Sequence, residues 1–267
     1  MEFFQQAVKL DPNFAMAHVA LANTYSIAAF NMNTPAGEAL PLAAAAAERA
    51  LAIDPALADA HAAKASIAAM DWRWEDAKRG FARALELNPD VAETQFRYGL
   101  VYLIPMNRFD EAIAAMRRAT ELEPQDMLYA AVLTRAYLAA GKTREALDHV
   151  KKIHALDPEH VITMEWHMIA SIAAGQGAEA LELIAKIRSK GNPRAGAGFA
   201  VMAYLSAGKP EDAQREWRST LDATASRPSD YYLALIAGAM GDRDHAFELF
   251  EHAFASRNPR LMYLQSD

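Results

Sequence analysis

The chain has 267 residues with a formal net charge of −7 at pH 7, and 52% of its residues are hydrophobic. This hydrophobic content excludes a disordered chain, and the acidic balance without a Lys/Arg-rich block argues against direct contact with nucleic acid. The absence of cysteine excludes disulfides, zinc–thiolate sites and cysteine nucleophiles, and it fits the reducing cytoplasm that we predict for this protein.

The start of the chain does not have the pattern of a targeting segment. Residues 1–6 lack the basic beginning and the long apolar core of a signal peptide. Further on, no uncharged apolar stretch reaches the length of about 18 residues that a membrane-spanning helix needs. We therefore expect no membrane span and no membrane partner.

Prolines then recur along the chain at a nearly constant spacing, each just after a segment of helical character. They are Pro12, Pro55, Pro89, Pro124, Pro158, Pro193, Pro228 and Pro259. The first interval is 43 residues and the last is 31, while the five between them are 34 or 35. A fixed period of this size marks an array of similar small units, and such arrays present extended binding surfaces.

Each interval carries two apolar stripes with the helical period of 3.6 residues. In residues 92–126 the first stripe includes Phe96 and Ile104, a turn follows at residues 105–108, and the second stripe begins at Phe109. The proline ends the second helix because it lacks an N–H group and disfavours helix at the residue before it. Glycines suited to a left-handed turn follow the first helix of several units, at Gly141, Gly175 or Gly177, Gly208 and Gly241.

Small residues recur seven positions apart in the second helices, as at Ala77 and Ala84, with a large residue such as Phe81 between them. This alternation resembles the tetratricopeptide repeat. The resemblance implies an all-α tetratricopeptide-repeat α-solenoid, a right-handed superhelix of antiparallel helix hairpins. It covers residues 1–267 as a single array, with a partial repeat at 1–14, about seven full repeats over 15–260 and a truncated capping segment at 261–267. The full repeats are expected at 15–57, 58–91, 92–126, 127–160, 161–193, 194–226 and 227–260, the first with about nine extra residues in a longer loop near 31–37.

Two stretches are similar to a narrower group of bacterial proteins. They are residues 71–77, Asp-Trp-Arg-Trp-Glu-Asp-Ala, and residues 229–236, Ser-Asp-Tyr-Tyr-Leu-Ala-Leu-Ile. In that group the repeats form the C-terminal region of multidomain signalling proteins that also carry winged-helix, class III adenylyl cyclase or kinase domains. No residue here matches a motif of those other domains, so the resemblance implies only a regulatory interaction role.

In this repeat family the first helices line the inner surface, so their outward positions are the predicted partner-binding residues. They are Asn23, Ser66, Arg97, Arg135, His167, Met202 and Tyr231. Arg97 and Arg135 belong to adjacent units, and either they face one anionic group together or each pairs with a neighbouring helix. The carboxylate clamp of some relatives is incomplete, because Val19 and Ala63 stand where a lysine and an asparagine are usual.

No motif for catalysis or metal binding is apparent. The eight histidines include no His-x-x-x-His pair, and Gly141-Lys142-Thr143 lacks the earlier glycine of a phosphate-binding loop. Acidic residues cluster at the starts of second helices, where they offset the helix dipole. We therefore predict no enzyme activity, no cofactor and no metal.

The sequence thus predicts a noncatalytic module that binds a protein or peptide, as the regulatory part of a bacterial signalling or transcription-regulating protein. The alternative is a small-molecule sensing domain, with a pocket among aromatic residues at Trp166, Phe199, Tyr204, Trp217, Tyr231 and Tyr232.

Two further features predict contacts. The first helix carries apolar residues with no preceding partner helix, at Phe3, Phe4, Val8 and Leu10, so end-to-end self-association is also expected. Trp72 and Trp74 flank a turn and either pack across the hairpin or contact a partner.

Overall fold

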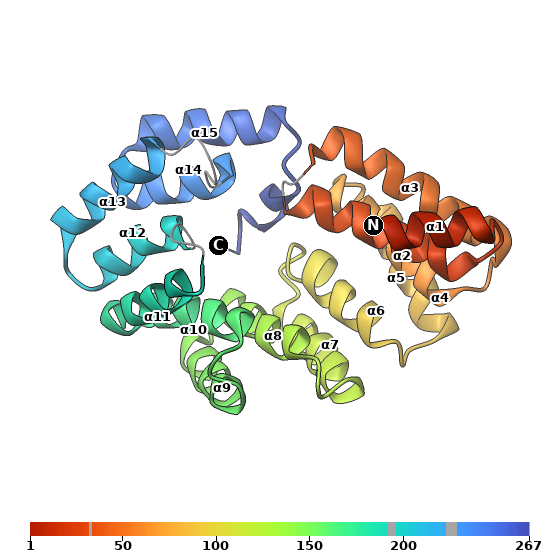
Figure 1. The fold of residues 1–267 in the computed structure, drawn as a ribbon, viewed down its shortest axis with the longest axis horizontal. Helices are drawn as coiled ribbons and strands as arrows, with labels where there is room; N and C mark the ends of the chain where they lie inside the picture. Colours follow the sequence, from red (N-terminus) through yellow and green to blue (C-terminus); the bar gives the residue numbers. More distant parts are fainter. Residues whose placement is uncertain (32–33, 192–195, 223–228, 267) are drawn as a thin grey trace. The chain divides into compact units, whose positions relative to one another are not determined.

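A computed structural model describes residues 1–31, 34–191, 196–222 and 229–266, and within these ranges it contains fifteen α-helices and no strands (Figure 1). The first helices of the hairpins are α2 (Ala15–Phe30), α4 (Ala58–Met70), α6 (Ala92–Arg97), α8 (Met127–Ala139), α10 (Val161–Ala173), α12 (Ala197–Ser206) and α14 (Asp230–Ala239). The second helices are α1 (Glu2–Leu10), α3 (Ala36–Ile53), α5 (Trp74–Leu87), α7 (Phe109–Leu122), α9 (Thr143–Leu156), α11 (Gly177–Ser189), α13 (Pro210–Asp222) and α15 (Arg243–Ala255). The predicted all-α class is confirmed. Of the sequence features discussed above, Met32 and Asn33 in the long loop and the boundary prolines Pro193 and Pro228 lie outside the described residues.

The helices pair closely because small side chains stand where they meet. A methyl group added at Gly80 in α5 would lie 2.8 Å from the β-carbon of Ala65 in α4, which is closer than two carbons pack. Phe81, which follows Gly80, is fully buried between the flanking alanines Ala77 and Ala84. The small, large, small alternation of the sequence therefore corresponds to close helix contact with one large side chain filling the space between.

The helices are grouped into two compact units. The first contains Met1–Pro124 together with Phe254–Asp267, and the second contains Gln125–Ala253. The end of the chain thus belongs to the same unit as its beginning, and in Figure 1 this unit runs from red to yellow and includes the blue C-terminal end. Whether the repeats form one continuous array stays a prediction.

The turn inside each of the six hairpins from α4–α5 to α14–α15 uses one left-handed residue. This residue is a glycine in four hairpins, at Gly141, Gly175, Gly208 and Gly241. Two hairpins of the first unit have Trp72 (φ 59°) and Asn107 (φ 57°) at this position instead. Asparagine tolerates the left-handed region, whereas a tryptophan there is strained by about 1–2 kcal/mol. The conformation of Trp72 therefore requires a compensating contact.

The hairpin at residues 92–126 differs from its neighbours by a π-helical segment, η1 (Tyr98–Leu103), which continues α6. Its two helices start at Ala92 and Phe109, one residue further apart than the pair that starts at Ala58 and Trp74. A π-turn holds one more residue than an α-turn, so the segment absorbs the insertion without shifting the rest of the helix.

Candidate functional site

The seven predicted partner-binding residues do not form one exposed surface. Ser66, Arg97, His167 and Tyr231 are buried, while Asn23, Arg135 and Met202 are half-buried. For the four buried residues the expected outward orientation is wrong. The hydroxyl of Ser66 donates to the Ala62 carbonyl one turn earlier at 2.9 Å, and the ring of Tyr231 packs edge-on against Phe250 at 6.2 Å. These side chains contribute to packing inside the hairpins and offer a partner little surface.

The two arginines proposed to share an anion have different environments. Arg97 is buried in the first unit and pairs with Glu93, one helical turn before it. Arg135 is half-buried in the second unit. Arg97 therefore pairs within its own helix and not with a neighbouring helix as the alternative expected, and a shared site with Arg135 stays a prediction.

A surface that the sequence did not indicate lies along the hairpin turns of the first unit. We call it the turn edge and define it by Phe30, Asn31, Asp71, Trp72 and Asn107. The C-terminal segment, residues 254–266, lies across it. The ring of Phe254 stacks on Trp72 with centroids 5.6 Å apart and planes inclined by 15°. The guanidinium of Arg257 lies 3.2 Å from Asp71 Oδ1.

The rest of the C-terminal segment continues along the same edge. The guanidinium of Arg260 lies 4.3 Å from the centre of the Phe30 ring and donates to Asn31 Oδ1 at 3.5 Å. The hydroxyl of Tyr263 donates to the Leu100 carbonyl at 3.3 Å. Further on, Asn107 Nδ2 donates to Gln265 Oε1 at 2.8 Å, so the segment contacts the turns of three successive hairpins. The first unit therefore holds a polypeptide segment through side chains of its turns.

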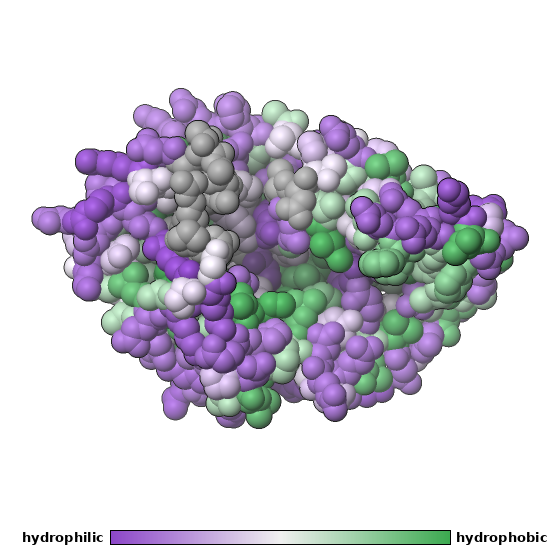
Figure 2. Space-filling model, viewed as in Figure 1, coloured by the Kyte–Doolittle hydropathy of each residue, from purple (hydrophilic) through white to green (hydrophobic). Residues whose placement is uncertain are grey.

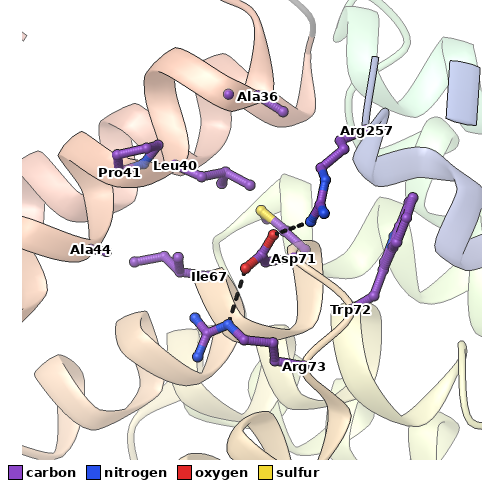
Figure 3. A pocket seen from close by; sticks show the side chains of 11 residues that line it. Ala36, Leu40, Pro41, Ala44, Ile67, Asp71, Trp72, Arg73 and Arg257 are labelled. Atoms are coloured by element: carbon purple, nitrogen blue, oxygen red, sulfur yellow. Dashed lines mark hydrogen bonds and ion pairs between the residues drawn. The ribbon is translucent and has the colours of Figure 1, made fainter. Parts of the chain in front are cut away.

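A small cavity of about 180 Å³ opens beside this contact (Figure 3). Its walls come from α3, from the end of α4 and from the turn after α4, with Leu40, Pro41 and Ile67 on the apolar side. Asp71 lies between two arginines in this view and accepts from Arg73 Nε at 3.0 Å through its second oxygen. The carboxylate thus ties the turn to the C-terminal segment.

The second candidate surface is the apolar face of α1, the only described helix of the first unit with no buried residue. The exposed fractions of the Phe3 and Leu10 side chains are 83% and 88%, and that of Phe4 is 40%. Figure 2 shows hydrophobic surface beside hydrophilic surface over α1, whose position is labelled in Figure 1. The exposed large apolar side chains of α1 make it a candidate contact surface.

A larger groove of about 480 Å³ runs between α3, α4 and α5. Its charged side chains are paired: Lys64 Nζ lies 3.4 Å from Glu48 and Arg73 Nη1 lies 2.7 Å from Asp76. Four basic side chains, Lys64, Arg73, Arg79 and Arg83, and two acidic ones, Glu48 and Asp76, line the groove, and each basic group has a carboxylate partner within 3.4 Å.

The second unit contains a cluster of titratable groups around His167. The rings of His154 and His167 lie 5.1 Å apart, and Glu179 lies 3.3 Å from His167 Nε2 and 3.0 Å from Lys151 Nζ. Burial lowers the pKa of both histidines, because the charged imidazolium loses its hydration. In the described ranges no group of three or more His, Cys, Asp or Glu side chains is placed to hold a metal ion.

The aromatic residues considered for a sensing pocket lie in hydrophobic cores. Trp217 is buried with Leu233 and Leu249, and Tyr204 packs against this cluster as well as the neighbouring one around Met164. Trp166 packs against a third cluster that includes Val150. These rings therefore fill the spaces between helices of the second unit.

The fold defines the class of protein: the described residues form an α-solenoid of antiparallel helix hairpins. Residues 92–126 match the family model of the tetratricopeptide repeat, and the fold as a whole is that of tetratricopeptide-repeat solenoids. No curated protein matches the sequence. None of the described helices is both long and apolar enough to cross a membrane.

Solved structures resemble this fold at low sequence identity. A tetratricopeptide repeat protein from Parabacteroides merdae has a TM-score of 0.63 and 14% identity, with 92% of this chain and 99% of that one covered. PilW, a type IV pilus biogenesis factor, has a TM-score of 0.59 and 21% identity over 80% of this chain and 97% of its own. Cut9, crystallised with Hcn1 in the APC/C hetero-tetramer, has a TM-score of 0.66 and 13% identity, with 98% of this chain and 51% of that chain covered.

Proposed function

We propose that this protein is a noncatalytic module that binds other proteins, and that it does so through the apolar face of α1. Tetratricopeptide-repeat proteins are generally noncatalytic scaffolds, and binding of a protein or peptide is the function that the fold suggests. The observation that carries the proposal is that Phe4 on α1 is exposed, whereas the residues at the equivalent position of four other second helices are buried.

The equivalence follows from the proline that ends each second helix. Phe4 stands eight positions before Pro12, and the residues eight positions before Pro55, Pro89, Pro124 and Pro158 are Ala47, Phe81, Met116 and Val150. All four of these are fully buried, whereas 40% of Phe4 is exposed. In these four second helices this position contacts a neighbouring helix. Exposing the apolar α1 face to water is therefore unfavourable, and burial of this face would be favourable.

We propose a second copy of the chain as the occupant, in an end-to-end contact. The chain itself carries a further exposed apolar helix face, on α15, where 69% of the Phe247 side chain is accessible. Joining the α1 face of one copy to the α15 face of another would remove both from water. A contact between two different faces is heterologous, so it can continue from copy to copy.

The test is the molar mass in solution, measured by multi-angle light scattering over a range of protein concentrations. The wild type is expected to associate as concentration rises, and Phe4→Glu is expected to stay monomeric because it places a charge on the apolar face. Gln5→Glu is the matched control, since it adds the same charge at an exposed position of α1 that lies about 100° or more around the helix from Phe3, Phe4 and Leu10. A wild type that is strictly monomeric at high concentration contradicts the proposal.

We further propose that the module regulates a bacterial signalling or transcription-regulating protein and acts in the cytoplasm without contacting nucleic acid. The supporting features are the similarity of residues 71–77 and 229–236 to repeat regions of such proteins, the absence of cysteine and the net charge of −7. A mobility-shift assay with duplex and single-stranded DNA is expected to show no binding at physiological salt, and a complex there would contradict this part.

The alternative, a small-molecule sensing domain, is less favoured. The 180 Å³ cavity beside Asp71 is smaller than the roughly 300–1,000 Å³ of most ligand pockets, and the groove of about 480 Å³ has such a volume but includes six charged residues where ligand pockets are mainly apolar. A thermal-shift screen with metabolites separates the two functions, because a sensing domain gains stability from a bound ligand at concentrations above its dissociation constant.

A further inference from the structure

We infer that the turn edge of the first unit is a recognition site for a basic, aromatic polypeptide segment, and that the protein's own C-terminal segment occupies this site in competition with such a partner. The site is separate from the α1 face, so the inference does not depend on self-association. It is supported by the pattern of the segment, by the residues that receive it and by the nature of the contacts.

The contacting side chains of the C-terminal segment follow one another at every third position. They are Phe254, Arg257, Arg260 and Tyr263. Residues 259–263 form the 3₁₀-helix η2 (Pro259–Tyr263), in which side chains three apart lie on the same side. Arg260 and Tyr263 therefore lie on one side of η2, while Phe254 is at the end of α15 and Arg257 has a left-handed backbone conformation (φ 50°) between the two helices. All four side chains of the pattern Phe-x-x-Arg-x-x-Arg-x-x-Tyr contact the first unit.

The segment also contains its own local structure. Asn258 Oδ1 accepts from the backbone N–H of Arg260 at 3.0 Å, and Pro259 occupies the first position of the 3₁₀-helix. Both features favour this turn before any contact is made. A pre-organised segment loses less conformational entropy when it binds, so a short peptide with this pattern is a reasonable ligand.

The turn edge is specialised where the segment crosses it. In the four hairpins that use a left-handed glycine, at Gly141, Gly175, Gly208 and Gly241, an added methyl group would meet no atom within 4 Å. In the two hairpins that depart from glycine, the substituted side chain contacts the C-terminal segment: Trp72 stacks on Phe254 and Asn107 donates to Gln265. Both turn residues that replace glycine, Trp72 and Asn107, therefore contact the C-terminal segment.

The charges of the two surfaces are complementary. Asp71 faces Arg257, and the Phe30 ring together with Asn31 Oδ1 faces Arg260. Arginine suits such sites because its planar group binds a carboxylate and also stacks on an aromatic face. The chain as a whole is acidic, which favours the approach of a basic partner.

The contacts at the start of the segment are open to competition. The exposed fraction of Phe254 is 66%, and that of the Arg257 side chain is 68%. An exposed ion pair contributes little stability and weakens as salt is added. A partner carrying the same pattern can therefore replace the first contacts before the buried Tyr263 leaves, so displacement does not need all contacts to break at once.

The experiment uses the full chain and a fluorescent peptide with the sequence of residues 254–266. In Arg257→Ala/Arg260→Ala the protein's own segment is weakened, and we expect this variant to bind the peptide at least about tenfold more tightly than the wild type does. A peptide in which both arginines are replaced by alanine is the matched control and is expected not to bind. Adding Trp72→Gly to the double variant is expected to reduce binding by a further factor of about ten or more, although glycine suits this turn in the other hairpins.

Circular dichroism establishes that each variant is folded. Equal affinity of the wild type and the double variant for the peptide would overturn the inference. So would peptide binding that Trp72→Gly leaves unchanged, or a folded double variant that does not bind the peptide.

A second measurement uses the protein with its own segment intact. Trypsin is expected to cleave after Arg257 and Arg260 several times faster in Trp72→Gly than in the wild type, and equal rates would count against the inference. Neither readout involves α1, so failure here is distinct from failure of Phe4→Glu to change the molar mass.

Discussion

At the residue scale, the burial of the first-helix positions was the least predictable feature. Ser66 and His167 were chosen as outward residues from their spacing, yet less than a tenth of either residue is exposed. A first helix in a solenoid contacts its own partner helix and also the first helices before and after it. Three such contacts cover most of the helix surface, so spacing along one helix cannot identify the narrow strip that stays accessible.

The histidine pair in the second unit gives a pH prediction at the same scale. Burial lowers the pKa of His154 and His167 in the folded state, while a histidine in the unfolded chain has a pKa of about 6.5. As the pH falls through about 6.5, the unfolded state therefore binds more protons than the folded state does. The free energy of unfolding is therefore expected to fall as the pH decreases from about 6.5. His167→Gln is expected to make this loss smaller in urea titrations at a series of pH values. His252→Gln removes an exposed histidine as the control, and a loss equally steep in His167→Gln and the wild type would contradict the assignment.

At the element scale, the sequence predicted the hairpins well but not their irregularities. The helix period and the proline spacing depend on local chemistry, which is why the helices fall where the apolar stripes are. The π segment η1 was not predicted, since an extra residue can be absorbed in a loop or in a helix with the same sequence spacing. Its placement inside the helix depends on what the preceding and following turns pack against.

The packing of η1 on α7 can be tested with a double-mutant cycle. A methyl group added at Gly99 would lie 2.5 Å from Met116 Cγ, so Gly99→Ala is expected to destabilise the protein. Met116→Ala is expected to cost about 2–5 kcal/mol because it leaves a cavity. Together they are expected to cost less than the sum, by about 1 kcal/mol, because the new methyl group occupies part of that cavity. The measurement is urea unfolding. Gly37→Ala adds a methyl group that meets nothing within 4 Å, so its effect should add to that of Met116→Ala, and additivity in the Gly99 cycle would contradict the contact.

At the scale of the whole molecule, the chain consists of two compact units, and the C-terminal segment belongs to the first. In a repeat protein each unit is stabilised mainly by its neighbours, so a local change is felt nearby. A segment that joins the end of the chain to its early hairpins is therefore a long-range element in an otherwise local structure.

This arrangement predicts where a core mutation acts. Tyr263→Ala removes a buried ring that contacts Phe30, and we expect a loss of about 3 kcal/mol or more together with faster amide hydrogen exchange in α2 and α4. Exchange in α10 to α13 should stay unchanged. Trp217→Ala is the matched control, because its ring is buried in the second unit and its effect should appear in α12 to α14. A uniform increase in exchange across both units after either substitution would show that they unfold as one.

The sequence by itself determined the all-α class, the helix hairpins and the turn positions of Gly141, Gly208 and Gly241, because helix period, proline and left-handed glycine act over a few neighbouring residues. It left the turn at Gly175 or Gly177, and the structure has the left-handed residue at Gly175. The tertiary structure alone decided which first-helix side chains are buried and where the C-terminal segment lies. The contact between Trp72 and Phe254 joins residues far apart in the sequence, so its formation depends on the path of the whole chain. In the sequence, the only signs of it were a tryptophan at a position where other hairpins have glycine and a three-residue spacing of Phe254, Arg257, Arg260 and Tyr263.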